Sequence, residues 1–212
     1  MLHSSQILIA AADALSSSDP VLANVIDHVG PCRLTPEPQT DLFEALLRSI
    51  IYQQLHGKAA SAIHARVLAL MPAPSPRALV ALPDSSLRAA GLSANKLLAL
   101  RDLAAKSLEG MVPSASAAAE LSDDELIERL TNVRGIGPWT VQMLMIFSLG
   151  RPDIMPVSDF AISKAFSLLY RRGRPAKSQA ILRHAKRWQP YRSVASWYLW
   201  RSLDLTLPAG NR

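Results

Sequence analysis

Apolar residues recur at spacings of three and four along most of the chain, which is the pattern of amphipathic helices. The period is clear from Leu42 to Ile50, after Thr40, a residue type that favours helix N-caps, and we expect Gly57 to end that helix. Strand patterns are nearly absent, because no sustained alternation of apolar and polar residues occurs. The sequence therefore predicts an all-α protein of about ten helices. Besides the helix that begins near Leu42, helices are expected at 7–15, 59–70, 75–82, 83–90, 94–109, 159–170, 178–188 and 192–203.

Two further predicted helices are joined by a short segment that contains two glycines. Ser122, followed three residues later by Glu125, resembles a capping box at the start of the first helix, and Pro138 suits the first position of the second. The connecting segment 133–137, V-R-G-I-G, allows positive φ and close approach of another surface. Its backbone N–H groups are suited to gripping a phosphate, although a plain corner between two helices contains the same glycines.

Composition excludes several classes of protein. With 212 residues, of which 49% are hydrophobic and 19% charged, the chain is long and apolar enough to build a core without cross-links. Its one cysteine, Cys32, excludes an internal disulfide, a cysteine-based zinc site and an iron–sulfur cluster. No apolar run approaches the length of a membrane span. We therefore expect an intracellular protein with no membrane partner, in the cytoplasm, or in the nucleoid if the cell is bacterial.

Positive charge is concentrated in the last quarter of the sequence. The net charge is +6, yet no acidic residue occurs between Asp159 and Asp204. Such a segment suits a polyanion such as a nucleic acid backbone, and it equally suits the solvated helix faces of a basic protein. Charge alone does not separate the two interpretations for these cations: Lys164, Arg171, Arg172, Arg174, Lys177, Arg183, Lys186, Arg187, Arg192 and Arg201.

Segment 130–141, L-T-N-V-R-G-I-G-P-W-T-V, resembles the helix-hairpin-helix signature of the DNA glycosylase superfamily. In that superfamily the hairpin is followed by a Gly/Pro-rich loop and an aspartate, and segment 150–159, G-R-P-D-I-M-P-V-S-D, supplies such a loop and ends on Asp159. Segment 50–60 resembles the family's segment that enters the DNA minor groove, while 188–193 and Trp200 resemble its C-terminal helix. These four blocks, in this order, are most similar to the 3-methyladenine glycosylase II branch.

The resemblance implies a fold and an activity. The fold would be one compact helical unit over 1–212, in two closely packed halves with a cleft between them. The helix-hairpin-helix would span 123–149, and the catalytic loop and helix start 150–160. The activity would be repair of double-stranded DNA by flipping out alkylated purines and hydrolysing the N-glycosidic bond. Relatives that also cut the backbone carry a lysine near Trp139, so the resemblance implies a monofunctional enzyme that leaves an abasic site.

Two alternatives from other classes remain open at this point. One is a non-catalytic protein that uses the hairpin to bind damaged or distorted DNA. The other is a helical scaffold for protein interactions, which need show no affinity for DNA and no dependence of binding on salt.

The resemblance also implies roles for individual residues. Asp159 would be the catalytic carboxylate, although an aspartate at a predicted helix start, judged without the family, is more readily an N-cap. Trp139, Met143 and Trp200 would line the base pocket, where core packing is the alternative for the tryptophans. Contacts to DNA would come from Gln54, Leu55, His56, Lys58, Arg134, Gly135, Gly137 and Thr140.

The resemblance further implies a monovalent cation, Na⁺ or K⁺, bound by the backbone carbonyls of Thr131, Val133 and Ile136. No other cofactor would be required. We expect the protein to be a monomer. The sequence departs from the family pattern at three positions. A small residue is usual at Tyr52, some relatives have an aromatic residue at Met143, and many have a further aspartate at Ser158.

Overall fold

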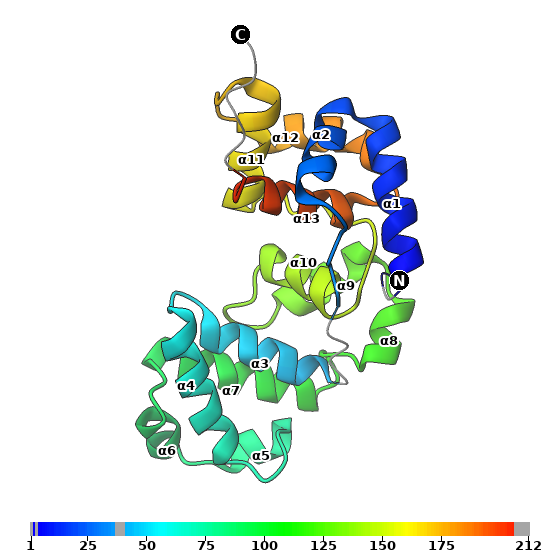
Figure 1. The fold of residues 1–212 in the computed structure, drawn as a ribbon. Coiled ribbons are helices and arrows are strands. Elements are labelled where there is room, and N and C mark those ends of the chain that lie inside the picture. The colour runs from blue at the N-terminus through cyan, green and yellow to red at the C-terminus, as the bar shows by residue number, and fades with distance from the viewer. Residues whose placement is uncertain (1, 3, 37–40, 206–212) are drawn as a thin grey trace. The chain divides into compact units, whose positions relative to one another are not determined.

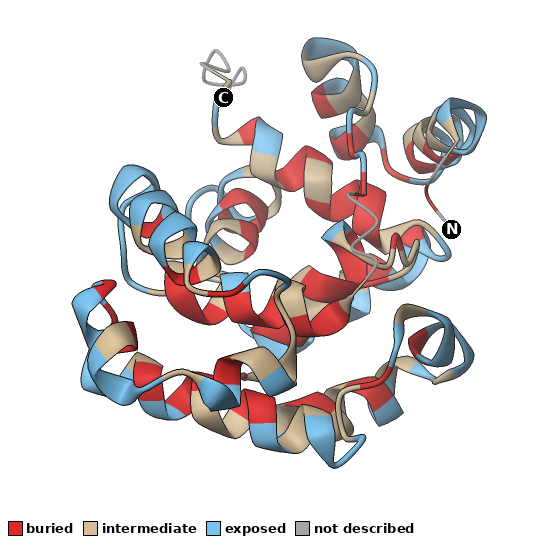
Figure 2. Ribbon diagram, turned by 90° about the horizontal axis from the view of Figure 1, so that it is seen from below, coloured by how far each residue is buried: buried red, intermediate tan, exposed pale blue. Residues whose placement is uncertain are grey.

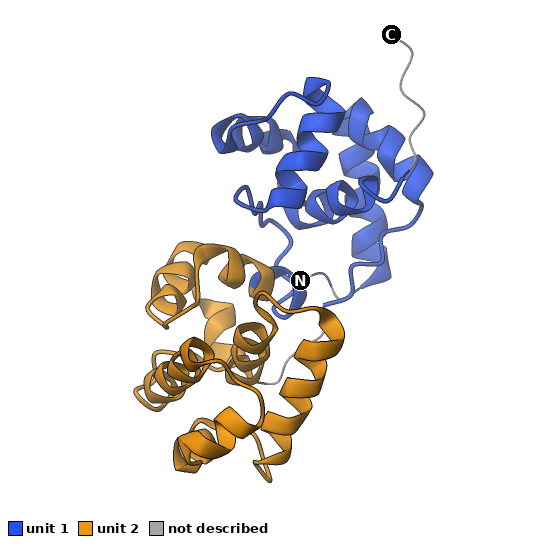
Figure 3. Cartoon of the chain, turned by 90° about the vertical axis from the view of Figure 1, so that its left-hand side faces the viewer, with its two compact units in different colours: residues 1–38, 145–212 blue, residues 39–144 orange. Residues whose placement is uncertain are grey.

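The structure, a computed structural model, describes residues 2, 4–36 and 41–205. Within these ranges the chain forms thirteen α-helices and one 3₁₀-helix and contains no strand, which confirms the all-α prediction. The chain divides into two compact units, residues 1–38 with 145–212 and residues 39–144 (Figure 3). None of the described helices is long and apolar enough to cross a membrane.

The unit formed by residues 39–144 is built around one long helix, α7 (Ala94–Leu108). Its apolar face buries Leu97, Leu100 and Leu103 against α3 and α5, with α6 alongside (Figure 1). The other helices of this unit are α3 (Leu42–Tyr52), α4 (Gly57–Ala69), α5 (Pro76–Ala81), α6 (Asp84–Ala89), α8 (Ala115–Glu120), α9 (Asp123–Thr131) and the first turns of α10 (Pro138–Phe147).

The other unit is organised around α13 (Arg192–Ser202), whose core positions include the fully buried Tyr198 and Leu199. This helix packs against α1, α2 and α11. Buried residues follow one side of most helices and exposed residues the other, as amphipathic patterns require (Figure 2). The remaining elements of the unit are α1 (Ser5–Ser18), α2 (Pro20–Val29), the end of α10, α11 (Phe160–Arg171), α12 (Ser178–Ala185) and the 3₁₀-helix η1 (Lys186–Trp188).

Two sequence expectations around α3 need comment. Thr40, the expected N-cap, lies outside the described residues, and Asp41 caps the helix by accepting a hydrogen bond from the backbone N–H of Phe43 at 2.8 Å. The prediction that Gly57 ends this helix was wrong, because α3 ends at Tyr52 and Gly57 begins α4. The chain reverses instead at Gln54, which adopts a left-handed φ of 56°. A polar residue supplies the turn for which a glycine was expected.

A buried carboxylate fastens the start of the chain to its last third. Asp19 caps α2, and its Oδ2 accepts hydrogen bonds from Tyr170 Oη at 3.0 Å, His184 Nε2 at 2.8 Å and Trp188 Nε1 at 3.0 Å. Burial by itself raises the pKa of Asp19, but these bonds and the N–H of Leu22 outweigh it and lower the pKa from 3.8 to about 2. Asp19 is therefore a fixed negative charge that joins α2 to α11, α12 and η1.

Candidate functional site

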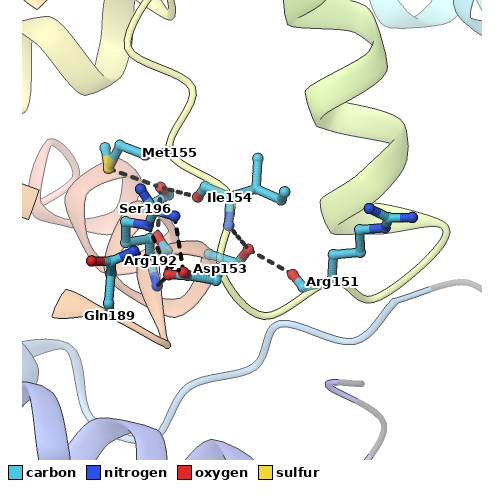
Figure 4. A network of polar contacts seen from close by, with 8 residues as sticks. Arg151, Asp153, Ile154, Met155, Gln189, Arg192 and Ser196 are labelled. Carbon is cyan, nitrogen blue, oxygen red and sulfur yellow. Dashed lines mark hydrogen bonds and ion pairs between the residues drawn. The ribbon is translucent and has the colours of Figure 1, made fainter. Parts of the chain in front are cut away.

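The loop that leads to Asp159 is fixed on the first turn of α13 by an ion pair (Figure 4). Arg192 Nε and Nη2 donate to the two carboxylate oxygens of Asp153 at 2.7 and 2.9 Å, in the bidentate geometry that arginine favours. Asp153 Oδ1 also accepts the backbone N–H of Arg192 at 3.2 Å. The carboxylate thus caps α13 from outside the helix, where negative charge is favourable to the helix dipole.

Two serines of α13 complete this attachment. The N–H of Ser193 donates to the carbonyl of Pro152 at 2.9 Å, its hydroxyl donates to the carbonyl of Arg151 at 2.6 Å, and the same hydroxyl oxygen accepts from the N–H of Ile154 at 3.0 Å. Ser196 adds a longer bond from its hydroxyl to the carbonyl of Ile154 at 3.4 Å. The otherwise unsatisfied N–H groups at the start of α13 therefore find acceptors in this loop. These hydrogen bonds to α13 thus hold segment 151–154 of the loop that leads to α11.

Asp159 lies at the start of α11, half-buried, after a tight turn in which its N–H donates to the carbonyl of Pro156 at 2.9 Å. Its Oδ1 accepts the N–H of Ile162 at 2.9 Å, so Asp159 is the N-cap that the sequence left open as an alternative. The same oxygen accepts a hydrogen bond from Trp200 Nε1 at 3.1 Å. The structure therefore brings together two residues, Asp159 and Trp200, that the sequence predicts for one site from segments 41 positions apart.

Two aromatic residues next to Trp200 and Asp159 were missed in the sequence. Phe147 stacks on Trp200 with ring centroids 5.6 Å apart, and Phe160, the residue after the aspartate, is 81% exposed. On α10, Phe147 follows the predicted pocket residues Trp139 and Met143 at steps of four, so the three share one helix face. Trp139 is 43% exposed, unlike a core tryptophan. The spacing of four was the signal that could have identified Phe147.

The hairpin between α9 and α10 presents backbone donors at its glycines. The capping box is present, since Ser122 accepts from the N–H of Glu125 and the glutamate accepts from the N–H of Ser122. Gly135 has a φ of 80°, which few other residues adopt. Within the described part of the chain, the N–H groups of Gly135 and Gly137 have no hydrogen-bond partner. A Cβ on Gly137 would meet nothing within 4 Å, so this side of the turn is open.

Side chains from α7 hold the hairpin in shape. Asp102 Oδ2 accepts the N–H of Arg134 at 2.6 Å and pairs with Lys106 at 3.1 Å, while Lys106 also donates to the carbonyl of Asn132. Burial raises the pKa of Asp102, but these donors and nearby positive charges lower it overall. Because both ends of the turn bond to one helix, its free N–H groups are pre-positioned rather than flexible.

The connection between α3 and α4, which the sequence predicts to enter the DNA, is attached to this hairpin. Gln53 Nε2 donates to the carbonyl of Gly135 at 2.8 Å, a contact across 82 positions that the sequence did not reveal. Gln54, one of the predicted DNA contacts, follows it in a left-handed conformation and is exposed. The remaining predicted DNA contacts are distributed as follows: Leu55, His56, Lys58 and Arg134 are exposed and Thr140 is buried.

The carbonyls predicted to hold a monovalent cation lie in this turn. The Thr131 hydroxyl donates back to the carbonyl of Ile127 at 2.7 Å, and the predicted ligand from this residue is its backbone oxygen. The carbonyl of Val133 accepts the N–H of Ile136 at 3.0 Å and keeps a second lone pair. Oxygen donors of this kind fit a hard cation such as Na⁺ or K⁺.

Comparison with known proteins agrees with these features. The family model described as HhH-GPD superfamily base excision DNA repair protein matches residues 47–190. Among curated proteins, DNA-3-methyladenine glycosylase 1 of Schizosaccharomyces pombe is 39% identical over 166 residues, which cover 77% of this chain and 73% of that protein. The alkylbase DNA glycosidase-like protein mag2 of the same yeast is 30% identical over 191 residues, covering 88% of this chain and 90% of that protein.

Solved structures show the same likeness. The S. pombe 3-methyladenine DNA glycosylase Mag1, in complex with abasic DNA, superposes with a TM-score of 0.82 at 36% identity, covering 93% of this chain and 98% of that one. A DNA-3-methyladenine glycosidase from Bacillus halodurans superposes with a TM-score of 0.83 at 34% identity, covering 91% of this chain and 88% of that one.

Proposed function

The chain belongs to the HhH-GPD superfamily of base excision DNA repair proteins, and from this premise we propose that it is a monofunctional DNA glycosylase that removes alkylated purines of the 3-methyladenine type. It binds double-stranded DNA, flips the damaged nucleotide out of the stack and hydrolyses its N-glycosidic bond. The similarity to enzymes named 3-methyladenine glycosylases over most of both chains supports this substrate class.

The observation that carries the proposal is the position of the Asp159 carboxylate. It lies at the N-terminus of α11, and hydrogen bonds from the Ile162 N–H and the Trp200 indole fix its orientation. Breaking an N-glycosidic bond develops positive charge on the sugar, and a carboxylate held in place before the reaction stabilises that charge. The ion pair between Asp153 and Arg192 serves the same end, because it immobilises the loop that delivers the aspartate.

The reaction needs only one such carboxylate. An alkylated purine already carries positive charge, so the electrons of the breaking bond neutralise it and the base departs without protonation. Water then forms the new bond to C1′ and loses a proton, leaving an abasic site. Position 139 is a tryptophan and not a lysine that could attack the sugar and form a Schiff base, so the DNA backbone stays intact.

The hairpin supplies binding that does not depend on base sequence. The N–H groups of Gly135 and Gly137 donate to a phosphate, aided by the N-terminus of α10. Gln54 fills the gap left by the flipped base, and its attachment through Gln53 to Gly135 ties this wedge to the phosphate contact. Trp139, Met143 and Trp200 contact the base, with the indole faces favouring a cation by about 0.5–2 kcal/mol.

We also propose that the enzyme acts as a monomer inside the cell and that the carbonyls of Thr131, Val133 and Ile136 hold Na⁺ or K⁺ when DNA is bound. The cation is tested by measuring affinity for DNA at constant ionic strength in KCl and in tetramethylammonium chloride, whose large cation cannot fit carbonyl ligands. Weaker binding in tetramethylammonium supports the site, and equal binding removes it.

The central test is Asp159→Asn, which preserves shape and the capping ability of the residue. Release of bases from methylated DNA should fall at least about a hundredfold, since a developing charge loses its partner. Affinity for DNA should stay within about threefold. The N-cap variant Asp41→Asn is the matched control and should change neither quantity. A protein that binds DNA but releases no base even as wild type would be the non-catalytic binder instead.

A further inference from the structure

The cations between Asp159 and Asp204 divide into two groups in the structure. Arg192 is neutralised by Asp153 and Arg201 by Asp204, so these two have structural partners. The other eight are exposed, and within the described residues none of them forms an ion pair or a side-chain hydrogen bond. Six of the eight lie at the end of α11, on the connection that follows it and on or next to α12. We call these six the α11–α12 basic surface, namely Arg171, Arg172, Arg174, Lys177, Arg183 and Lys186.

Three of these cations lie on the six residues 172–177 that connect α11 to α12, Arg171 is the last residue of α11, and the connection is held by hydrogen bonds. Arg172 ends α11 in a left-handed conformation, and Gly173 N–H donates to the carbonyl of Ser167 at 2.9 Å. The Ser167 hydroxyl accepts the N–H of Ala176 at 3.0 Å. The backbone that carries these charges is therefore fixed by a buried serine, so little order must be gained when a ligand binds.

The remaining two cations extend the surface along α12. This helix buries Ile181 and Ala185 on one side, and Arg183 lies on the opposite, exposed side. The exposed Lys186 follows directly after the helix, three positions beyond Arg183. α12 packs on α11 in the same unit (Figure 1). The six charges thus lie on adjoining elements of one unit.

This arrangement is unfavourable for folding alone. Lys177 occupies the N-cap of α12, where the helix dipole disfavours positive charge and where Ser, Thr, Asp or Asn is preferred. Like charges on one short connection repel, and no acidic side chain pairs with them in the described part of the chain. A polyanionic ligand would remove both penalties.

Helix α11 connects Asp159, which we place at the substrate, to this surface. α11 begins immediately after Asp159 and runs for 12 residues to Arg171, so the helix spans about 18 Å. That distance corresponds to about five base-pair steps of duplex DNA at 3.4 Å each. The exposed cation Lys164 lies between the two ends of the helix. The duplex backbone meets the connection when the duplex, with its flipped nucleotide at Asp159, runs along α11, and the proposal requires this orientation.

We propose that the α11–α12 basic surface is a second contact for the DNA backbone, separate from the hairpin, which binds phosphates of the duplex flanking the damaged nucleotide. This inference rests on the proposed function, because it takes the position of the substrate from Asp159. The surface supplies affinity without sequence information, as contacts to phosphate do.

The test compares two double variants with the same change in net charge. Arg171→Gln with Arg174→Gln removes two cations of the surface and avoids the left-handed Arg172. Arg33→Gln with Arg77→Gln is the control, because these arginines are also exposed and have no side-chain partner in the described chain. The affinity for a fluorescein-labelled duplex carrying an abasic-site analogue is measured by anisotropy over a series of KCl concentrations, and base release is measured with enzyme in excess.

The surface variant should bind about tenfold more weakly at low salt, and its slope of log affinity against log salt should be smaller by up to about 2, since each lost phosphate contact removes about 0.9. The control variant should match the wild type, and saturated base release should be unchanged in both. Equal slopes for the two variants overturn the proposal. So does unchanged DNA affinity accompanied by lost binding to phosphatidylserine vesicles, which would make the surface a lipid contact. Failure of the proposed function is distinct, because the wild type would then release no base.

Discussion

The two glycines of the hairpin have different physical roles, and substituting each by alanine separates folding from DNA binding. Gly135 has a φ of 80°, where a Cβ costs about 1–2 kcal/mol. Gly137 has no positive φ, and a Cβ there would meet no atom within 4 Å. The stability of Gly137→Ala should therefore stay within about 0.5 kcal/mol of the wild type, whereas Gly135→Ala should unfold at a clearly lower urea concentration.

For the affinity for DNA, the expected order of the two variants is the reverse of that for stability. The added methyl group of Gly137→Ala occupies the open space through which a phosphate approaches the N–H groups, so one charge-assisted hydrogen bond is lost. Such a bond is worth about 1.5–3 kcal/mol, which corresponds to about ten- to a hundredfold in affinity. Urea unfolding followed by circular dichroism gives the stability, and anisotropy of a labelled duplex gives the affinity.

The reasoning is refuted if Gly137→Ala binds DNA as tightly as the wild type, since the open side of the turn would then not face the phosphate. It is also refuted if the loss of affinity is matched by an equal loss of stability. The second outcome would mean that Gly137 is needed for the fold.

Three further predictions concern the scaffold. The pKa of Asp19 is about 2 in the folded protein and 3.8 without its partners, so its ionised form contributes about 2 kcal/mol to the free energy of unfolding. This contribution should be complete above pH 4 and fade as the pH falls toward 2. The urea midpoints of Asp19→Asn should lack this part of the pH dependence that the wild type shows. Arg192→Lys keeps the charge but loses the bidentate grip on Asp153, so single-turnover base release should slow about tenfold with unchanged DNA affinity, and an unaltered rate would contradict the positioning role. Burial raises the pKa of Cys32 to about 11, so iodoacetamide at pH 8 should label the native protein at least about a hundredfold more slowly than in urea, as read by mass spectrometry; equal rates would disprove a protected thiol.

Local signals in the sequence predicted much of the fold. The Ser122–Glu125 capping box, Pro138 at the first position of α10 and Asp159 at the start of α11 all lie where the sequence placed them. Each is a rule about residues within one helical turn, and such rules act before tertiary contacts form. The same rules missed α2, although Asp19 followed by Pro20 is a standard helix start.

What the sequence did not reveal depends on contacts between distant segments. The bond from Gln53 to Gly135 and the ion pair of Asp153 with Arg192 join residues 82 and 39 positions apart. No local period reports such pairs, and in the sequence each member is an ordinary polar residue. Gly57 was misassigned for a related reason, since the reversal after α3 is made by Gln54 in a conformation that glycine usually takes.

The most direct test of the account is the reaction of the wild-type protein with randomly methylated duplex DNA, with the released bases identified by liquid chromatography and mass spectrometry. We predict free alkylated purines, 3-methyladenine among them, and strands that break at the abasic sites only after treatment with alkali. Release of no base by an enzyme that binds the duplex would contradict the central claim, and strand cleavage without alkali would contradict hydrolysis by water alone.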